Sequence, residues 1–229
     1  MLRFDQLSYW EKHSFTENID FLIIGAGIVG SACALRLREL YPLSKILIVE
    51  RGYLPSGAST KNAGFACFGS VTEIADDLKN IPADEVWSTV DLRWRGLQRL
   101  QERFHAEKIG LKFNGSWDLI DENVSFAEHF DKLEYFNAET QKITGHSACY
   151  SFDKTVSKTC GFNGIAGGFY SRLEGELDTG KLFTETQKLL ANAEITTLFG
   201  VEILEIQESE NGVTVNTSQG ELKSVFNSP

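Results

Sequence analysis

The residues with the clearest chemical meaning are three glycines near the start of the chain, spaced as G-x-G-x-x-G. They are Gly25, Gly27 and Gly30, within the run GAGIVG. The apolar run 19–24 before them predicts a buried strand, and the spacing of small and apolar residues over 28–40 predicts a helix. This order is typical of a turn whose backbone amides, at the N-terminus of a helix, hold a pyrophosphate.

Each residue of the pattern has a physical task. Gly25 permits the tight turn out of the strand, Gly27 leaves room for a pyrophosphate, and Gly30 lets the helix pack closely on the sheet. A second apolar run, 46–49, ends at Glu50, whose carboxylate would accept a hydrogen bond from a ribose 2′-hydroxyl and repel a 2′-phosphate. We therefore expect a βαβ dinucleotide-binding unit with NADP disfavoured. The alternative is a strand–turn–helix whose glycines serve packing alone.

Composition sets the outer limits of the interpretation. The 229 residues are 42% hydrophobic and 24% charged, which is ordinary for a globular protein. A net charge of -10 argues against a nucleic-acid partner, because phosphate binding needs clustered Lys and Arg. No apolar run approaches the roughly 20 residues of a membrane span, and the first residues do not resemble a signal peptide. We expect a cytoplasmic protein with no membrane span.

The cysteines and histidines show no spacing that would hold a metal. There are 4 cysteines and 4 histidines, and none of the cysteines form a C-x-x-C pair. We predict no metal site, and free, mostly buried thiols.

The rest of the chain divides into shorter elements. Residues 55–70 are rich in Gly, Ser and Ala with hardly any charge, which is typical either of a loop pressed against a large ligand or of a tightly packed internal loop. Asp178 is a good N-cap for a helix that follows it. The further elements that we expect are a long amphipathic helix over 86–104, strands over 112–121, 161–170, 195–199, 201–206 and 212–217, and a helix over 125–136.

The sequence resembles a known family over two stretches. The run DFLIIGAGIVGSACALRLRE with ILIVERGYLPSGASTKNAGFACFGS is similar to the N-terminus of the D-amino-acid-oxidase-like FAD-dependent oxidoreductases, the group that includes glycine and sarcosine oxidases. The stretch GGFYSRLEGELDTGKLFTETQKLL and the run 199–203 resemble later parts of the same family. The match is strong over 20–70, moderate over 160–206 and weak between them.

The resemblance implies FAD as the cofactor and a role for each matching residue. Lys61 could stabilise the reduced flavin as a nearby cation, although an ordinary surface lysine explains it equally well. The implied contacts are Gly25, Gly27, Ile28, Val29 and Gly30 at the pyrophosphate, Glu50 at the ribose, Arg51 beside the adenine, Ser59 and Thr60 at phosphate or ribityl oxygens, Lys61, Asn62, Ala63 and Gly64 beside the isoalloxazine, and Val201 under the adenine.

The implied fold is an α/β, Rossmann-like FAD/NAD(P)-binding βαβ domain with part of a mixed α+β substrate domain. We expect residues 1–80 and 172–229 to form the FAD-binding domain, and 81–171 the partial substrate or cap domain. The implied function is an FAD-dependent oxidoreductase that oxidises a small amine or amino acid by hydride transfer to flavin. The alternatives are a non-catalytic dinucleotide-binding module and an NAD-linked oxidoreductase.

The chain also departs from the family at its end. Residues 223–229 stand where a strand returning to the first sheet should begin, and the family's carboxylate-binding Arg and covalent flavin-linking Cys belong beyond that point. We therefore transfer no catalytic residue. Two explanations stay open: a fragment or truncated form of an oxidoreductase, or a short protein that has lost the activity. In either case we expect weak FAD binding, negligible amine oxidation and a tendency to associate.

Overall fold

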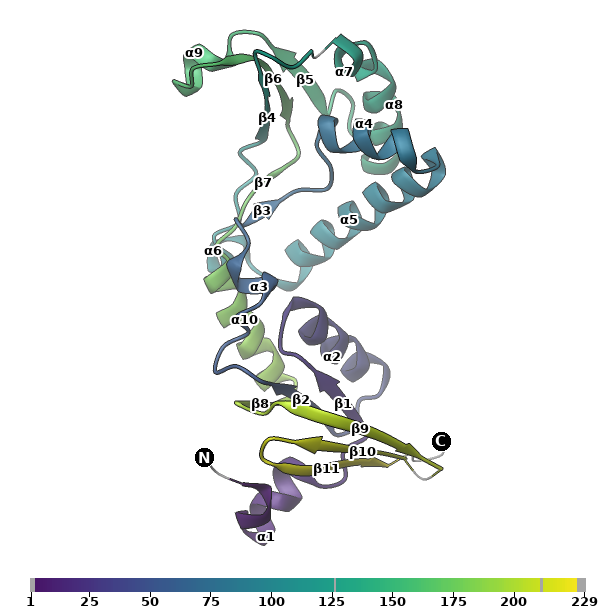
Figure 1. Ribbon diagram of the computed structural model, residues 1–229, viewed down its shortest axis with the longest axis vertical. Helices are drawn as coiled ribbons and strands as arrows, with labels where there is room; N and C mark the ends of the chain where they lie inside the picture. The colour runs from purple at the N-terminus through teal and green to yellow at the C-terminus, as the bar shows by residue number, and fades with distance from the viewer. Residues whose placement is uncertain (1–2, 126, 211, 226–229) are drawn as a thin grey trace. The chain divides into compact units, whose positions relative to one another are not determined.

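The structure is a computed structural model that describes residues 3–125, 127–210 and 212–225. It divides the chain into two compact units, Met1–Ala63 with Thr179–Pro229, and Gly64–Asp178 (Figure 1). We expected residues 64–80 and 172–178 in the FAD-binding domain, but they fold with the second unit.

The first unit contains a parallel sheet of three strands. Strands β1 (Phe21–Ile24), β2 (Ile46–Glu50) and β8 (Thr196–Phe199) lie in the order β1-β2-β8. Helix α2 (Ile28–Leu40) connects β1 to β2, and helix α10 (Thr179–Asn192) leads into β8. The expected strand–helix–strand unit is therefore present, and among the described strands β1 pairs only with β2.

Strand β2 lies between two hydrophobic clusters, and all five of its residues are buried. Because side chains alternate along a strand, Ile46 and Ile48 face one cluster and Leu47 and Val49 face the other. This explains why the run reads as continuously apolar. The first cluster includes Ala34 of α2 and Leu190 of α10, and the second includes Ile19, Val201, Val215 and Leu222.

Three antiparallel strands follow the parallel sheet. They are β9 (Ile203–Ser209), β10 (Gly212–Thr217) and β11 (Gly220–Val225), in the order β11-β10-β9. The strands expected over 201–206 and 212–217 correspond to β9 and β10, which pair antiparallel, and Asn211 between them lies outside the described residues. The expected beginning of a return strand at residue 223 is wrong, because residues 220–225 pair antiparallel with β10.

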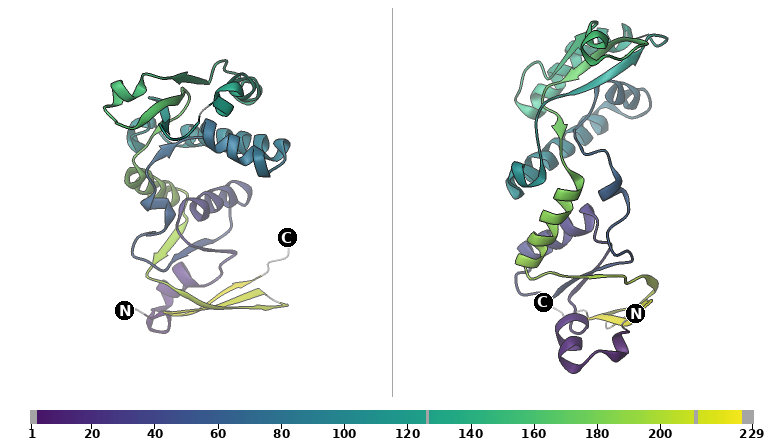
Figure 2. Two further views of the ribbon diagram at one scale, coloured as in Figure 1. Left: turned by 45° about the horizontal axis from the view of Figure 1, so that its top comes forward. Right: turned by 90° about the vertical axis from the view of Figure 1, so that its left-hand side faces the viewer.

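A short arm precedes β1 and packs on β11, as Figure 2 shows. It consists of η1 (Phe4–Gln6), α1 (Tyr9–Glu11) and η2 (Lys12–Thr16). The N–H of Phe4 donates to the carbonyl of Gln219 at 2.8 Å. Phe4 also packs against the hydrophobic cluster that includes Val215 and Leu222, so the beginning of the arm is held on the first unit.

The second unit is built on an antiparallel sheet of three strands. Strands β4 (Ser116–Asp121), β5 (Tyr150–Asp153) and β6 (Ile165–Ser171) lie in the order β4-β6-β5. The short strands β3 (Phe65–Ala66) and β7 (Gly175–Glu176) pair beside it. Its helices are α4 (Val71–Asn80), α5 (Ala83–Arg103), α6 (Ala106–Ile109), α7 (Ala127–Asp131), α8 (Leu133–Thr144) and α9 (Val156–Cys160).

Two expected elements of this unit differ in extent. The strand expected over 112–121 begins only at Ser116, because Gly115 before it has a φ of +78° and turns the chain. The helix expected over 125–136 is two helices, α7 and α8, with the break at Lys132. The long amphipathic helix is confirmed as α5.

A buried carboxylate ties residues 64–80 to the second unit. Glu174 is 1% exposed. Its Oε1 accepts hydrogen bonds from the backbone N–H groups of Phe68 and Gly69 at 2.9 and 3.0 Å, and its Oε2 accepts one from the hydroxyl of Ser116 at 2.6 Å. A buried carboxylate without donors would be strongly unfavourable, so these contacts fix the backbone after β3.

The cysteines differ from the expectation of mostly buried thiols. Cys149 is buried, whereas Cys33, Cys67 and Cys160 are exposed, and all four are free. Among the described residues, no helix combines the length and apolar character that a membrane crossing needs.

Candidate functional site

The glycine-rich turn joins β1 to α2 at the carboxyl end of the parallel sheet. Gly25 has a φ of +96°, which side-chain-bearing residues rarely adopt. A Cβ at Gly30 would run into the carbonyl oxygen of Gly25, so this glycine permits close packing of helix on strand. A Cβ at Gly27 would lie 2.9 Å from the Oγ of Ser59, in the space directly before the helix.

The N-terminus of α2 presents backbone donors. The N–H of Ile28 donates to the Oγ of Ser59 at 2.9 Å. Within the part of the chain that the structure describes, the N–H groups of Gly27, Val29 and Gly30 donate no hydrogen bond. Unpaired amides at a helix N-terminus, together with the helix dipole, favour an anion.

Glu50 lies beside this turn and is 9% exposed. Its Oε2 accepts a hydrogen bond from the N–H of Ala26 at 3.1 Å, and its Oε1 accepts one from the N–H of Gly52 at 2.9 Å. A carboxylate offers about four acceptor positions, so two remain for a ligand. The carboxylate therefore fixes the turn and still has capacity to accept a hydroxyl donor.

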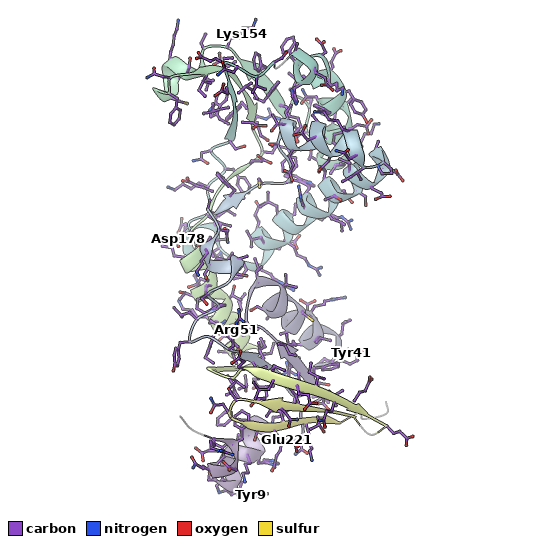
Figure 3. All side chains as sticks on the ribbon, in the orientation of Figure 1. Tyr9, Tyr41, Arg51, Lys154, Asp178 and Glu221 are labelled. Carbon is purple, nitrogen blue, oxygen red and sulfur yellow. The ribbon has the colours of Figure 1, made fainter. Side chains whose placement is uncertain are left out.

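A cleft of about 300 Å³ opens next to Glu50. A volume of that order is at the lower end for sites that hold small molecules. Figure 3 labels Arg51, which follows directly on the end of β2. The residues that line the cleft are Ile24, Gly25, Val49, Glu50, Arg51, Val201, Glu202 and Ile203.

Val201 lies in the cleft with its backbone donor already used. Its N–H donates to the carbonyl of Glu50 at 2.9 Å, and β9, expected from residue 201, begins at Ile203. The Val201 side chain belongs to the hydrophobic cluster under β2. The N–H of Val201 is therefore not free to donate a hydrogen bond to a ligand in the cleft.

The segment after β2 holds the other expected contacts. It forms the short helix α3 (Ala58–Lys61), in which the hydroxyl of Thr60 donates to the carbonyl of Pro55 at 2.6 Å. The amide of Asn62 donates to the carbonyls of Ala58 and Ser59, both at 3.0 Å. Of the expected contacts in this segment, Ser59 lies at the glycine-rich turn. The side chains of Thr60 and Asn62 instead donate hydrogen bonds to backbone carbonyls of the same segment.

The last expected contacts lie on either side of the division between the units. Lys61 and Ala63 are exposed and belong to the first unit, whereas Gly64 is buried, has a φ of +77° and belongs to the second.

Three participants were not expected from sequence: Ala26, Gly52 and Glu202. The first two act through backbone N–H groups, which any residue other than proline supplies, so no side-chain signal points to them. Glu202 directly follows Val201, which was expected at the adenine, and this neighbouring position is the one sequence signal that could have indicated Glu202.

The residues present fit the ADP half of FAD. The unpaired amides of α2 match a pyrophosphate, the buried Glu50 matches a ribose, and the cleft beside it has room for a base. Rossmann-like architecture and this site together define a dinucleotide-binding protein of the α/β class.

The comparison with protein families narrows the class from dinucleotide-binding proteins to one family. Residues 20–228 match the family described as DAO, FAD dependent oxidoreductase, and the chain belongs to that family. FAD is accordingly its cofactor. No curated protein matches the chain.

Solved structures share the fold at low sequence identity. Glycine oxidase from Bacillus cereus ATCC 14579 has a TM-score of 0.62 and 23% identity, with 90% of this chain and 53% of that chain covered. L-proline dehydrogenase from P. horikoshii has a TM-score of 0.67 and 15% identity, with 92% and 52% covered. L-amino acid deaminase from Proteus vulgaris has a TM-score of 0.64 and 16% identity, with 93% and 47% covered. The chain thus spans about half the length of these solved structures.

Proposed function

We propose that this chain binds FAD through its ADP half, as part of an oxidoreductase that acts on a small amine or amino acid. The observation that carries the proposal is the set of unpaired amides at the N-terminus of α2, placed beside the buried Glu50. The amine or amino-acid class is supported by the names of the solved structures that share the fold, which include a glycine oxidase and an L-amino acid deaminase.

The residues of the first unit divide the work of binding. The amides of Gly27, Val29 and Gly30 would donate to pyrophosphate oxygens, and the α2 dipole would stabilise their charge. Ser59 accepts from Ile28, and its own hydroxyl proton remains available to a phosphate oxygen. Its contribution is a donor placed directly in front of the helix.

The adenosine end depends on Glu50 and Arg51. Glu50 would accept from a ribose hydroxyl while its bonds to Ala26 and Gly52 keep it in place. Arg51, exposed on the cleft, can lie over the face of an adenine ring as a cation. When bound, FAD supplies a ring that accepts hydride from the substrate carbon bearing the amine.

The two units would have separate tasks. We assign FAD binding to the unit formed by residues 1–63 and 179–229, and a substrate or cap role to residues 64–178. We assign the remaining expected contacts of the first unit, Thr60, Lys61, Asn62, Ala63 and Val201, to the cofactor as part of the same proposal.

A second candidate is a dinucleotide-binding module without turnover. It is favoured by the contacts that the structure brings together, because they all lie at the proposed ADP site. Both candidates require FAD binding, so turnover separates them.

The test is a binding and turnover assay on the 229-residue chain. Absorbance of bound flavin after incubation with FAD, compared with binding of NAD, separates a flavoprotein from an NAD-linked enzyme. Dye reduction with glycine, sarcosine, proline and other amino acids then separates an oxidoreductase from a module. Binding of NAD in preference to FAD would overturn the proposal, and bound FAD without turnover would favour the second candidate.

A further inference from the structure

The cleft beside Glu50 carries two charged side chains of opposite sign. Arg51 and Glu202 both line it, and both residues are exposed. Among the described residues no ion pair joins them or either one to another group. Both charges are therefore available to a ligand in the cleft.

The backbone of Glu202 is held on both sides. Its N–H donates to the hydroxyl of Ser218 at 3.1 Å, and its carbonyl accepts from the N–H of Ser218 at 2.8 Å. The side chain therefore starts from a fixed point on the wall of the cleft. The neighbouring Val201 N–H is already used by Glu50, so that N–H is not available to a base.

The position of a bound base follows from the two other contacts of the nucleotide. Pyrophosphate belongs at the N-terminus of α2 and ribose at Glu50, so the base must extend from the ribose away from the phosphate. Arg51, Val201 and Glu202 line the same cleft as Glu50, so they are the residues that a base in this cleft can meet.

We propose that Glu202 determines the base specificity of this site by accepting a hydrogen bond from the 6-amino group of adenine. Adenine carries a donor at that position, whereas guanine carries an acceptor. An ionised carboxylate only accepts, so it favours the first and repels the second. This inference rests on the proposed function, because it requires an adenine nucleotide in the cleft.

The test compares two nucleotides that differ at one group. ADP and the 5′-diphosphate of purine riboside are the same except that the second has hydrogen in place of the 6-amino group. We expect the 229-residue chain to bind ADP about tenfold more tightly, which is what one hydrogen bond to a charged group contributes when it is partly exposed. Isothermal titration calorimetry measures both dissociation constants.

Variants at two glutamates then assign the preference. In Glu202→Ala the ratio of the two dissociation constants should fall to near one, and in Glu202→Gln it should fall only in part, because an amide oxygen still accepts. The two nucleotides carry the same charge, so a general gain in anion affinity cancels in the ratio. Glu208→Ala, which removes the same charge from an exposed position on β9 outside the cleft lining, should keep the parent ratio.

The outcomes separate this inference from the function on which it rests. A parent ratio near one, or a ratio unchanged in Glu202→Ala while ADP still binds, would overturn the role of Glu202 and leave the site assignment intact. Failure of the parent chain to bind either nucleotide or FAD would overturn both.

Discussion

Glu50 both stabilises the glycine-rich turn and is available to a ligand. Its two oxygens accept from Ala26 and Gly52, so the turn has its shape before any nucleotide binds. A ribose hydroxyl would occupy one of the remaining acceptor positions. Binding then needs little rearrangement, and this preorganisation favours affinity.

Replacing this carboxylate should weaken nucleotide binding. In Glu50→Ala we expect FAD affinity to fall by about 1.5–3 kcal/mol, the contribution of a hydrogen bond to a charged group. The loss of two backbone partners should also lower the melting temperature. Fluorescence titration with FAD and thermal unfolding measure the two effects, with Glu208→Ala as the charge-matched control. Unchanged affinity would remove the ribose assignment.

Gly27 allows a test of the pyrophosphate position. Its φ of -68° is open to any residue, so Gly27→Val changes space more than backbone preference. The new Cβ would lie 2.9 Å from the Oγ of Ser59, and the branched methyls would occupy the region in front of the helix amides. We expect FAD binding to be abolished.

The control for that variant is Gly57→Ala, because a Cβ at Gly57 meets nothing within 4 Å. It should bind FAD like the parent chain. A Gly27→Val chain that still binds FAD with parental affinity would show that the pyrophosphate does not lie against this turn.

At the scale of elements, the site depends on how closely α2 packs on β1. A Cβ at Gly30 runs into the carbonyl of Gly25, so Gly30→Ala must push the helix away from the strand. We expect a lower free energy of unfolding and weaker FAD binding together. Chemical denaturation followed by circular dichroism, with FAD titration on the same samples, measures both.

A second glycine-to-alanine substitution should change the free energy of unfolding in the opposite direction. Gly96 lies within α5, where a Cβ meets nothing within 4 Å. Because glycine in a helix interior is destabilising relative to alanine, Gly96→Ala should raise stability by about 0.5–1 kcal/mol. If Gly30→Ala and Gly96→Ala change the free energy of unfolding in the same direction and by the same amount, the close contact of α2 with the turn does not determine the effect of Gly30→Ala.

Elements with strong local patterns could be predicted from sequence. Strands β1 and β2 each follow from a continuous apolar run, helix α2 follows from the spacing of its small and apolar residues, and α5 follows from its amphipathic spacing. Strand β11 was missed because its pairing depends on β10 and not on its own residues. The break between α7 and α8 was missed as well, since no glycine or proline marks it.

The candidate site could be predicted only in part, for a related reason. The roles of the glycines and of Glu50 can be predicted from their residue types and spacing. The contact between Ile28 and Ser59 joins residues 31 apart in sequence, and the contact between Ala26 and Glu50 joins residues 24 apart. Such pairings depend on the tertiary fold, which periodicity does not encode.

At the scale of the whole molecule, the unit boundaries follow buried polar contacts more than composition. Glu174 holds the N–H groups of Phe68 and Gly69 within the second unit. No sequence pattern marks this carboxylate as buried, because Glu is rarely found fully buried. The first unit, in contrast, contains every element of the proposed ADP site.

The central claim is that the first unit holds the ADP half of FAD, and one competition experiment tests it most directly. The 229-residue chain is titrated with FAD by flavin fluorescence, and the bound FAD is then challenged with ADP and, separately, with FMN, which lacks the AMP part of FAD and carries only one of its two phosphates. The account predicts that ADP displaces FAD and that FMN at the same concentration does not. Displacement by FMN but not by ADP, or no binding of FAD at all, would contradict it.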